Sequence, residues 1–211
     1  MNLHDLDWDD RFDRDYYENG IKTGKSLYEN YCWHPEISMP IAYKLKSMFP
    51  DQRILDFGCA KGFLVRALRS IGVKAYGFEV SKYAVINCDE KAIFFIAFPG
   101  LKRYPKVDIV YTKDVLEHFE YDEIDDVLRM LWGLCRQAFM IIPFGDNGKY
   151  RIPDYHKDTS HIIAENEDWW LKKFDRAGFA GCRFDYKWGN LKRNWKDYPK
   201  GNGFFRLWRS Q

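Results

Sequence analysis

Short apolar runs alternate with longer segments of helical spacing along most of the chain. The apolar runs predict strands at residues 54–57, 74–80, 93–98, 107–112, 138–143, 179–188 and 204–209. Apolar positions on one helical face predict helices at residues 37–48, 64–71, 121–135 and 165–177. Ser81, a residue suited to cap a helix, predicts a further helix through residue 92. Because strands and helices alternate, the chain is predicted to be an α/β protein with helices around a mainly parallel sheet. The continuous apolar run at residues 93–98 is expected to be a strand buried on both faces.

The most informative segment, residues 56–63 (DFGCAKGF), joins the first predicted strand to the helix that follows it. Gly58 and Gly62 lack the Cβ atoms that would keep a ligand away from the backbone. The first amides of the following helix have no partner within it, so the turn is suited to hold polar groups of a ligand. The spacing differs from the G-x-G-x-x-G of dinucleotide-binding folds, and Asp56 precedes the first glycine by two residues. The alternative interpretation is an ordinary glycine turn between a strand and a helix.

Glu79 is a second candidate, near the carboxyl end of the strand predicted at residues 74–80 and 21 residues after Gly58. An acid at about this distance from the first glycine is placed to accept hydrogen bonds from two ribose hydroxyls. Ser81 is suited to cap the next helix. A single glutamate at the end of a strand is otherwise most often a solvated surface residue, and its distance from the glycine turn favours the ribose role.

Residues 56–62 resemble motif I of the class I S-adenosylmethionine-dependent methyltransferases, (D/E)-x-G-x-G-x-G, with Ala60 in place of the middle glycine. Residues 77–81 are similar to motif II of the same family. The resemblance implies a Rossmann-like, doubly wound sheet of seven strands with an antiparallel strand at its C-terminal edge. It also implies S-adenosyl-L-methionine (SAM) as the cofactor. The cofactor-binding residues that it implies are Asp56, Gly58, Cys59, Ala60, Lys61, Gly62, Phe63, Glu79, Val80, Ser81, Thr112 and Lys113.

The segment after the strand at residues 107–112 adds to the resemblance. Asp114 and the V-L-E-H stretch that ends at His118 resemble motif IV and a signature of small-molecule methyltransferases. The polar loop at residues 145–166 supplies His161, in a stretch similar to the D-x-x-H of methyltransferases that act on sugars. Since ligands bind at the carboxyl ends of the strands in such sheets, we expect a general base among Asp114, His118 and His161. Alternatively, Asp114 only caps a helix, His118 is a packed aromatic, and His161 lies on a mobile surface loop.

The N-terminal residues 1–50 are predicted to be an arm and lid, and residues 51–211 the SAM-binding domain. Aromatic residues are dense between residues 16 and 35, in a segment too polar for a core helix and too aromatic for a free tail. This segment is either a cap packed on the sheet or a lid whose aromatic faces meet the sulfonium of the cofactor.

Composition narrows the remaining choices. A length of 211 residues suits one α/β domain, and a net charge of +2 is too small to require a nucleic acid or a membrane as partner. The five cysteines contain no C-x-x-C pair, so we expect reduced thiols in a cytoplasmic protein. The N-terminus does not resemble a signal peptide. His156, Asp158 and His161 lie on one flexible segment without a fourth ligand, so no metal site is expected.

The sequence therefore predicts a SAM-dependent methyltransferase that modifies an oxygen or nitrogen atom of a small molecule, such as a sugar or another metabolite. A nucleic-acid methyltransferase is the alternative suggested by the basic, aromatic loop at residues 189–203, although a solvated loop explains those charges more simply. A cofactor-binding module without turnover belongs to a different class and also stays open. A nicotinamide oxidoreductase is disfavoured by the missing G-x-G-x-x-G.

Overall fold

The computed structural model describes residues 1–101 and 104–209. Residues 2–109 form one compact unit, and the residues from Val110 on, together with Met1, form a second. We call these the N-terminal unit and the C-terminal unit. The boundary predicted near residue 50 separates a lid from a cofactor-binding domain by function, whereas these two units are distinguished by their internal contacts. The functional boundary stays a prediction.

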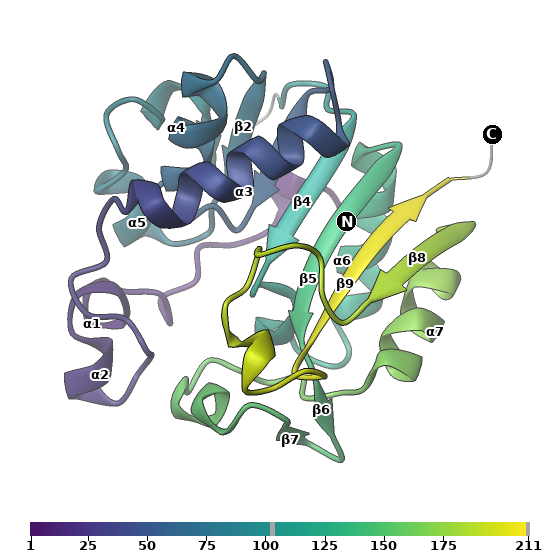
Figure 1. The fold of residues 1–211 in the computed structure, drawn as a ribbon. Helices are drawn as coiled ribbons and strands as arrows, with labels where there is room; N and C mark the ends of the chain where they lie inside the picture. Colours follow the sequence, from purple (N-terminus) through teal and green to yellow (C-terminus); the bar gives the residue numbers. More distant parts are fainter. Residues whose placement is uncertain (102–103, 210–211) are drawn as a thin grey trace. The chain divides into compact units, whose positions relative to one another are not determined.

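Seven strands make up the main sheet, as predicted, in the order β3-β2-β1-β4-β5-β9-β8. Their bounds are β1 (Ile54–Phe57), β2 (Ala75–Phe78), β3 (Ile96–Ala97), β4 (Ile109–Lys113), β5 (Gln137–Pro143), β8 (Gly181–Asp185) and β9 (Asn202–Trp208). Strands β1, β2 and β3 pair in parallel, whereas β9 runs antiparallel to β5 and to β8. The α/β class and the antiparallel strand near the C-terminal edge are therefore confirmed (Figure 1).

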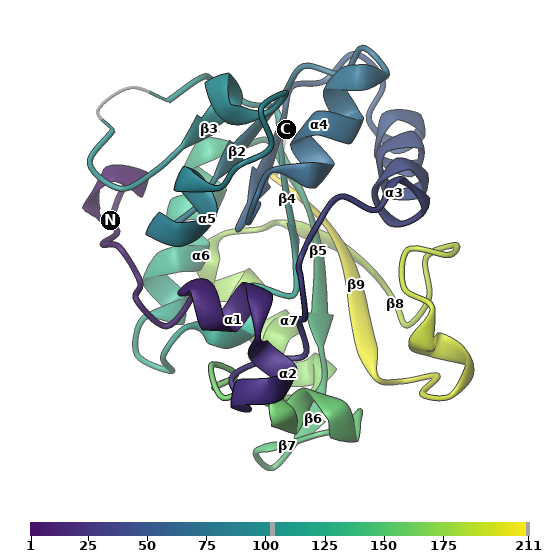
Figure 2. The same cartoon turned by 90° about the vertical axis from the view of Figure 1, so that its left-hand side faces the viewer.

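The N-terminal unit contains five α-helices among its described residues. They are α1 (Arg14–Glu18), α2 (Gly20–Thr23), α3 (Pro35–Met48), α4 (Phe63–Ser70) and α5 (Lys82–Ile86). The long helix α3 packs beside α4 (Figure 2). The apolar face of α4 buries Val65, Ala67 and Leu68, which is the face that the spacing in the sequence predicts.

Two predicted elements of this unit are wrong in extent. The run at residues 93–98 is a 3-10 helix over Ile93–Phe95 followed by a strand of two residues, and the Phe94 side chain is 89% exposed. A continuous apolar run cannot distinguish a buried strand from a short helical turn that directs one side chain outward. The helix predicted to reach residue 92 ends at Ile86, and Asp89 holds the chain that follows. The Asp89 carboxylate accepts from Arg66 at 2.6 Å, and its amide donates to the Lys61 carbonyl at 2.9 Å.

Gly62 has a packing role that the sequence did not indicate. It has a left-handed φ of 76°, and a Cβ atom there would lie 2.6 Å from Cδ1 of Ile96 and 2.9 Å from Cβ of Ala92. Both residues belong to a buried cluster behind the turn. The missing side chain therefore allows α4 to start against the core, rather than opening space for a ligand on that side.

The C-terminal unit has two longer helices, α6 (Ile124–Leu134) and α7 (Glu167–Ala177), which lie side by side (Figure 1). Its core is aromatic: Trp170 and Phe174 on α7 are buried, and the ring of Phe174 lies 4.9 Å from that of Phe205 on β9. The segment predicted as a loop at residues 145–166 contains a hairpin of β6 (Gly145–Asp146) and β7 (Lys149–Tyr150) and a 3-10 helix at Pro153–Lys157.

We expect Gly62→Ala to reduce the free energy of unfolding by about 1–3 kcal/mol more than Gly72→Ala does. Both glycines have left-handed φ angles, 76° and 83°, so both variants carry the backbone cost of roughly 1–2 kcal/mol. Gly72 has open space at the Cβ position, so this control isolates the packing cost at Gly62. Urea unfolding followed by circular dichroism measures both variants. Equal unfolding midpoints would show that the core behind Gly62 accommodates a methyl group.

Candidate functional site

The turn between β1 and α4 is built from left-handed residues. Gly58, Ala60 and Gly62 have φ angles of 77°, 48° and 76°. The amides of Gly58 and Cys59 both donate to the Phe78 carbonyl, at 2.9 Å and 3.1 Å, which fixes the turn to the end of β2. Ala60, at the position of the middle glycine of the motif, adopts the left-handed conformation although it carries a Cβ atom.

Glu79 follows β2 directly and is buried. Its Oε2 accepts from the Ala60 amide at 2.6 Å, and its Oε1 accepts from the amides of Val80 at 2.9 Å and Ser81 at 2.8 Å. Burial raises the pKa of Glu79 to about 6, although the three amides oppose the shift. An ionised carboxylate has about four lone-pair sites, so acceptor capacity remains for a ligand hydroxyl.

Other residues predicted to bind the cofactor serve first to build the site. Ser81 caps α5 as predicted: its hydroxyl accepts from the Ala84 amide at 3.0 Å and donates to the Phe12 carbonyl at 2.5 Å. The Cys59 side chain is buried in a cluster with Val65. These side chains position the turn and the carboxylate, which leaves the backbone of the turn and Glu79 as the ligand-facing candidates.

Lys61 connects the turn to the N-terminal segment. Its ammonium is buried, pairs with the carboxylate of Glu18 and donates to the Tyr31 carbonyl at 2.9 Å. The hydroxyl of Tyr83 also donates to Glu18, at 3.1 Å. A lysine that was predicted to bind the cofactor is thus committed to holding residues 18–31 in place.

The N-terminal aromatic segment lies against the turn and Glu79. The Tyr31 ring lies 5.3 Å from that of Phe63, the first residue of α4, and the Trp33 ring lies 6.0 Å from it. The Asp9 amide donates to the Val80 carbonyl at 3.1 Å. Burial, followed by the charges of nearby carboxylates that include Glu79, raises the pKa of Tyr31. The segment therefore covers the site, and its function as a lid stays a prediction.

In the C-terminal unit, Asp114 follows β4 with a left-handed φ of 55°. Its Oδ2 accepts from Lys113 at 2.7 Å, and its Oδ1 accepts from Lys192. Burial raises the pKa of Asp114, but the two ammonium groups outweigh it and hold the pKa well below its ordinary value. Such a carboxylate stays ionised and is a weak base.

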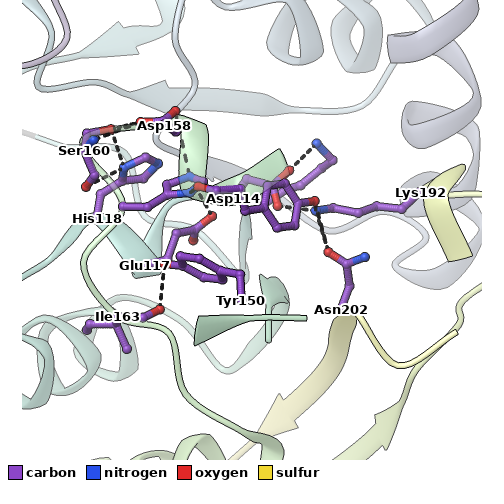
Figure 3. Close-up of polar contacts among 12 residues, drawn as sticks. Asp114, Glu117, His118, Tyr150, Asp158, Ser160, Ile163, Lys192 and Asn202 are labelled. Atoms are coloured by element: carbon purple, nitrogen blue, oxygen red, sulfur yellow. Dashed lines mark hydrogen bonds and ion pairs between the residues drawn. The ribbon is translucent and has the colours of Figure 1, made fainter. Parts of the chain in front are cut away.

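Lys192 joins three segments of this unit. Besides pairing with Asp114, it donates to the Tyr155 hydroxyl at 2.6 Å and to Oδ1 of Asn202 on β9 at 2.8 Å (Figure 3). Only 7% of Lys192 is exposed. The prediction of a solvated basic loop at residues 189–203 is therefore wrong at this lysine, which is part of a buried polar network.

Glu117 is fully buried, and within residues 1–101 and 104–209 neither of its carboxylate oxygens has a hydrogen-bond partner. Its backbone carbonyl accepts from the amides of Ile162 and Ile163, at 2.8 Å and 2.9 Å, which joins the two segments that carry the site. Burial, followed by the charge of Asp114, raises the pKa of Glu117 well above its ordinary value.

The two predicted catalytic histidines lie together beside Glu117, with ring centroids 4.7 Å apart. Nδ1 of His118 lies 3.2 Å from the Ser160 carbonyl oxygen, and Nδ1 of His161 lies 2.8 Å from the Tyr155 carbonyl oxygen. Burial, then the neighbouring His161, lowers the pKa of His118 to about 4, and burial also lowers the pKa of His161. Both rings are therefore neutral and weakly basic at neutral pH.

The remaining predicted residues do not extend this cluster. Nε2 of His156 accepts a hydrogen bond from the Tyr150 amide at 3.0 Å. Thr112 is buried in β4, and its hydroxyl has no partner among the described residues, whereas Lys113 is paired with Asp114. Thr112 and Lys113 were predicted to bind the cofactor together with the glycine turn. They belong to the C-terminal unit, whereas the glycine turn belongs to the N-terminal unit.

Sequence reasoning missed Glu117 and Lys192. Glu117 stands in the V-L-E-H stretch, and the signal that could have identified it is an acid within a short apolar stretch. Lys192 is separated from Asp114 by 78 residues, and no local pattern distinguishes it from the other basic residues of its loop.

Comparison with known proteins agrees with the fold. The structure of a SAM-dependent methyltransferase from Archaeoglobus fulgidus superposes with a TM-score of 0.59 at 12% identity, over 83% of this chain and 97% of that one. Magnesium protoporphyrin IX methyltransferase from Synechocystis PCC 6803, solved with bound SAH, gives a TM-score of 0.60 at 19% identity, over 95% and 94%. The chain therefore has the fold of the class I SAM-dependent methyltransferases, as the sequence predicted.

A curated relative is a probable tRNA (uracil-O(2)-)-methyltransferase from Caenorhabditis elegans, 25% identical over 138 residues. The match covers 60% of this chain, which spans only about a quarter (24%) of that relative's length. In the described part of the chain, every helix is too short or too polar to cross a membrane. Residues 41–155, more than half of the chain, match the family described as methionine biosynthesis protein MetW, and the protein belongs to this family.

Proposed function

We propose that the protein transfers the methyl group of SAM to an oxygen or nitrogen atom of a small molecule. The observation that carries the proposal is the buried Glu79 carboxylate, hydrogen-bonded to the left-handed turn at Ala60. The class I methyltransferase fold supports it, as does the likeness to solved structures of small-molecule methyltransferases. The match to a relative named as a tRNA methyltransferase makes RNA the alternative acceptor.

The residues of the N-terminal unit fit SAM. The remaining acceptor capacity of Glu79 suits a ribose hydroxyl, and the first amides of α4 are available because a helix cannot satisfy them internally. When bound, SAM supplies a methyl group made electrophilic by its sulfonium charge. Tyr31 and Phe63, whose rings lie 5.3 Å apart beside the turn, are aromatic residues suited to face that charge.

The environments of Asp114, His118 and His161 argue against a strong general base among them. Asp114 is held ionised by two lysines, and burial depresses the pKa of both histidines. Catalysis under this proposal rests mainly on alignment of the acceptor with the methyl group, which can supply roughly 7–11 kcal/mol of barrier lowering. An amine that arrives neutral needs no base, and a hydroxyl acceptor needs another source of activation.

Calorimetric titration tests the cofactor, and we expect saturable binding of SAM and of its demethylated product but not of NAD. Transfer of a labelled methyl group from SAM into a metabolite extract below about 1 kDa, and in parallel into total RNA, tests the acceptor. Label in the small-molecule fraction alone is the expected result. Label in RNA alone would replace the small-molecule proposal with the RNA alternative, and tighter binding of NAD than of SAM would overturn both.

Glu79 should make SAM binding pH-dependent. Its pKa of about 6 means that the carboxyl is neutral at pH 5 and ionised at pH 7. A hydrogen bond to a charged group contributes about 1 kcal/mol more than one to a neutral group, so affinity should rise about fivefold to tenfold across this range. Glu79→Gln should lose the dependence, and Glu90→Gln, a change at an exposed glutamate of the same unit, should retain it. An identical pH profile in all three proteins would remove Glu79 from the cofactor site.

The stability of the protein without SAM should fall as pH rises, which is opposite to the expected change in SAM affinity. The pKa of Glu79 is raised above its unfolded value of 4.5, so its stabilising contribution is fully present below pH 4.5 and is lost as pH rises through about 6. Relative to Glu79→Gln, the wild-type free energy of unfolding should fall by about 2 kcal/mol over this window. Urea unfolding at pH 4.5 and pH 7 measures the difference.

A further inference from the structure

Three potential metal-ligating side chains meet inside the C-terminal unit. Glu117 and His118 come from the 3-10 helix at Leu116–His118, and His161 comes from the segment between the 3-10 helix at Pro153–Lys157 and α7. One ligand atom from each of the three residues can be chosen so that all lie within 4.8 Å of one another. Glu117 and His118 are drawn together in Figure 3, beside the Asp158–Ser160 pair. The sequence analysis expected no metal site because His156, Asp158 and His161 lie on one segment without a fourth ligand. The structure instead brings His161 to Glu117 and His118, and Nε2 of His156 accepts a hydrogen bond from the Tyr150 amide.

The hydrogen bonds of the two histidines direct Nε2 toward this cluster. A carbonyl oxygen can only accept, so His118 donates from Nδ1 to Ser160 and His161 donates from Nδ1 to Tyr155. In both rings Nε2 then carries the lone pair, and Nε2 of His161 lies 3.9 Å from Oε1 of Glu117. Histidine ligands of metals are usually held in this way, with the other ring nitrogen donating to a carbonyl or carboxylate.

A second layer orients the His118 ring. The Ser160 hydroxyl donates to Oδ1 of Asp158 at 2.5 Å, and its oxygen therefore accepts from Nδ1 of His118 at 2.9 Å. Oδ2 of Asp158 lies 3.9 Å from Nε2 of His161. The chain of contacts His118–Ser160–Asp158 fixes the tautomer and the ring plane.

The environment of the Glu117 side chain points to a ligand independently of the two histidines. Its side chain is fully buried, and among the described residues no donor reaches either carboxylate oxygen. Buried polar groups are almost always hydrogen-bonded, and buried charges are paired or coordinate metals, so the two oxygens of Glu117 without a donor are suited to bind a cation. The amides of Ile162 and Ile163 hold its backbone in place and leave its side chain directed at the histidines.

We propose that Glu117, His118 and His161 bind one divalent transition-metal ion. Two imidazoles and one carboxylate suit zinc, manganese, iron or cobalt, whereas magnesium and calcium prefer oxygen ligands alone. Ligand atoms at about 2.0–2.2 Å from a metal ion lie roughly 3.0–3.6 Å from one another. The ligand atoms of the three residues now lie within 4.8 Å of one another, so they would approach one another by about 1 Å when the ion binds. Three protein ligands leave at least one coordination position open.

The open position bears on the acceptor, and this extension rests on the proposed methyl transfer. A metal ion binds an oxygen ligand and lowers the pKa of a hydroxyl group. It would provide the activation that Asp114 and the two histidines are poorly suited to give as bases. The site therefore favours a hydroxyl compound over an amine as the acceptor class.

The metal alone tests the site, without cofactor or acceptor, so the result does not depend on the proposed function. Full-length protein is treated with chelator, dialysed and titrated with Mn²⁺, Co²⁺ or Zn²⁺ by calorimetry, and the absorption spectrum of the Co²⁺ form is recorded. We expect one ion per chain with micromolar affinity or better, and a spectrum of mixed nitrogen and oxygen ligation. The wild-type melting temperature should rise with metal concentration.

Variants identify the ligands. Glu117→Gln and His161→Ala should each weaken binding by at least about 100-fold, and Ser160→Ala, which removes only the orienting hydroxyl, by roughly 10–100-fold. The matched control is His156→Ala, a histidine of the same segment outside the cluster, and it should change affinity less than about threefold. Circular dichroism confirms folding, and Ser160→Ala keeps the test decisive if Glu117→Gln does not fold.

Three results would overturn the proposal. The first is the absence of saturable binding up to about 1 mM of each metal. The second is an equal loss of affinity in His156→Ala and His161→Ala, which would assign binding to loop histidines. The third is unchanged affinity in both Glu117→Gln and Ser160→Ala.

Discussion

The carboxylate of Glu79 fixes the geometry on which the N-terminal unit depends. It receives the Ala60 amide from the turn after β1 and the amides of Val80 and Ser81 from the chain after β2. These bonds hold the ends of two parallel strands together at one edge. Because the carboxylate is buried, the three amides replace the water that it loses, and they keep the left-handed turn in place. The start of α4 and the covering aromatic segment both depend on that turn.

Three acids, of which Glu79 and Glu117 are buried and Asp114 is partly buried, are compensated in different ways. Glu79 uses backbone amides, and Asp114 uses the ammonium groups of Lys113 and Lys192. Glu117 has neither kind of partner among the described residues. Since a buried carboxylate costs free energy unless a donor or a cation compensates it, the three environments suit different roles: the proposed cofactor recognition at Glu79, an ion pair at Asp114 and the proposed cation site at Glu117.

The sequence predicted the order of strands and helices because local periodicity encodes which face of each element is buried. It also predicted the turn at residues 58–62 and the placement of Glu79, since both depend on neighbours within a few residues and on strand ends that share an edge. It was wrong where a local pattern is ambiguous, as at Phe94. It placed His118 and His161 near each other, because both follow strands of the same sheet, but their weak basicity comes from burial that no motif encodes.

The sequence by itself determined the class of the protein: the alternation of elements, the glycine turn, the acid after the second strand and the V-L-E-H stretch. The tertiary structure decided which charges are paired and which are not. The Lys61–Glu18 and Lys192–Asp114 pairs join residues 43 and 78 positions apart, and the lack of a hydrogen-bond donor to the Glu117 carboxylate among the described residues depends on everything packed around it. Hydrogen bonding and desolvation depend on distance in space, which a linear sequence specifies only after the chain has folded.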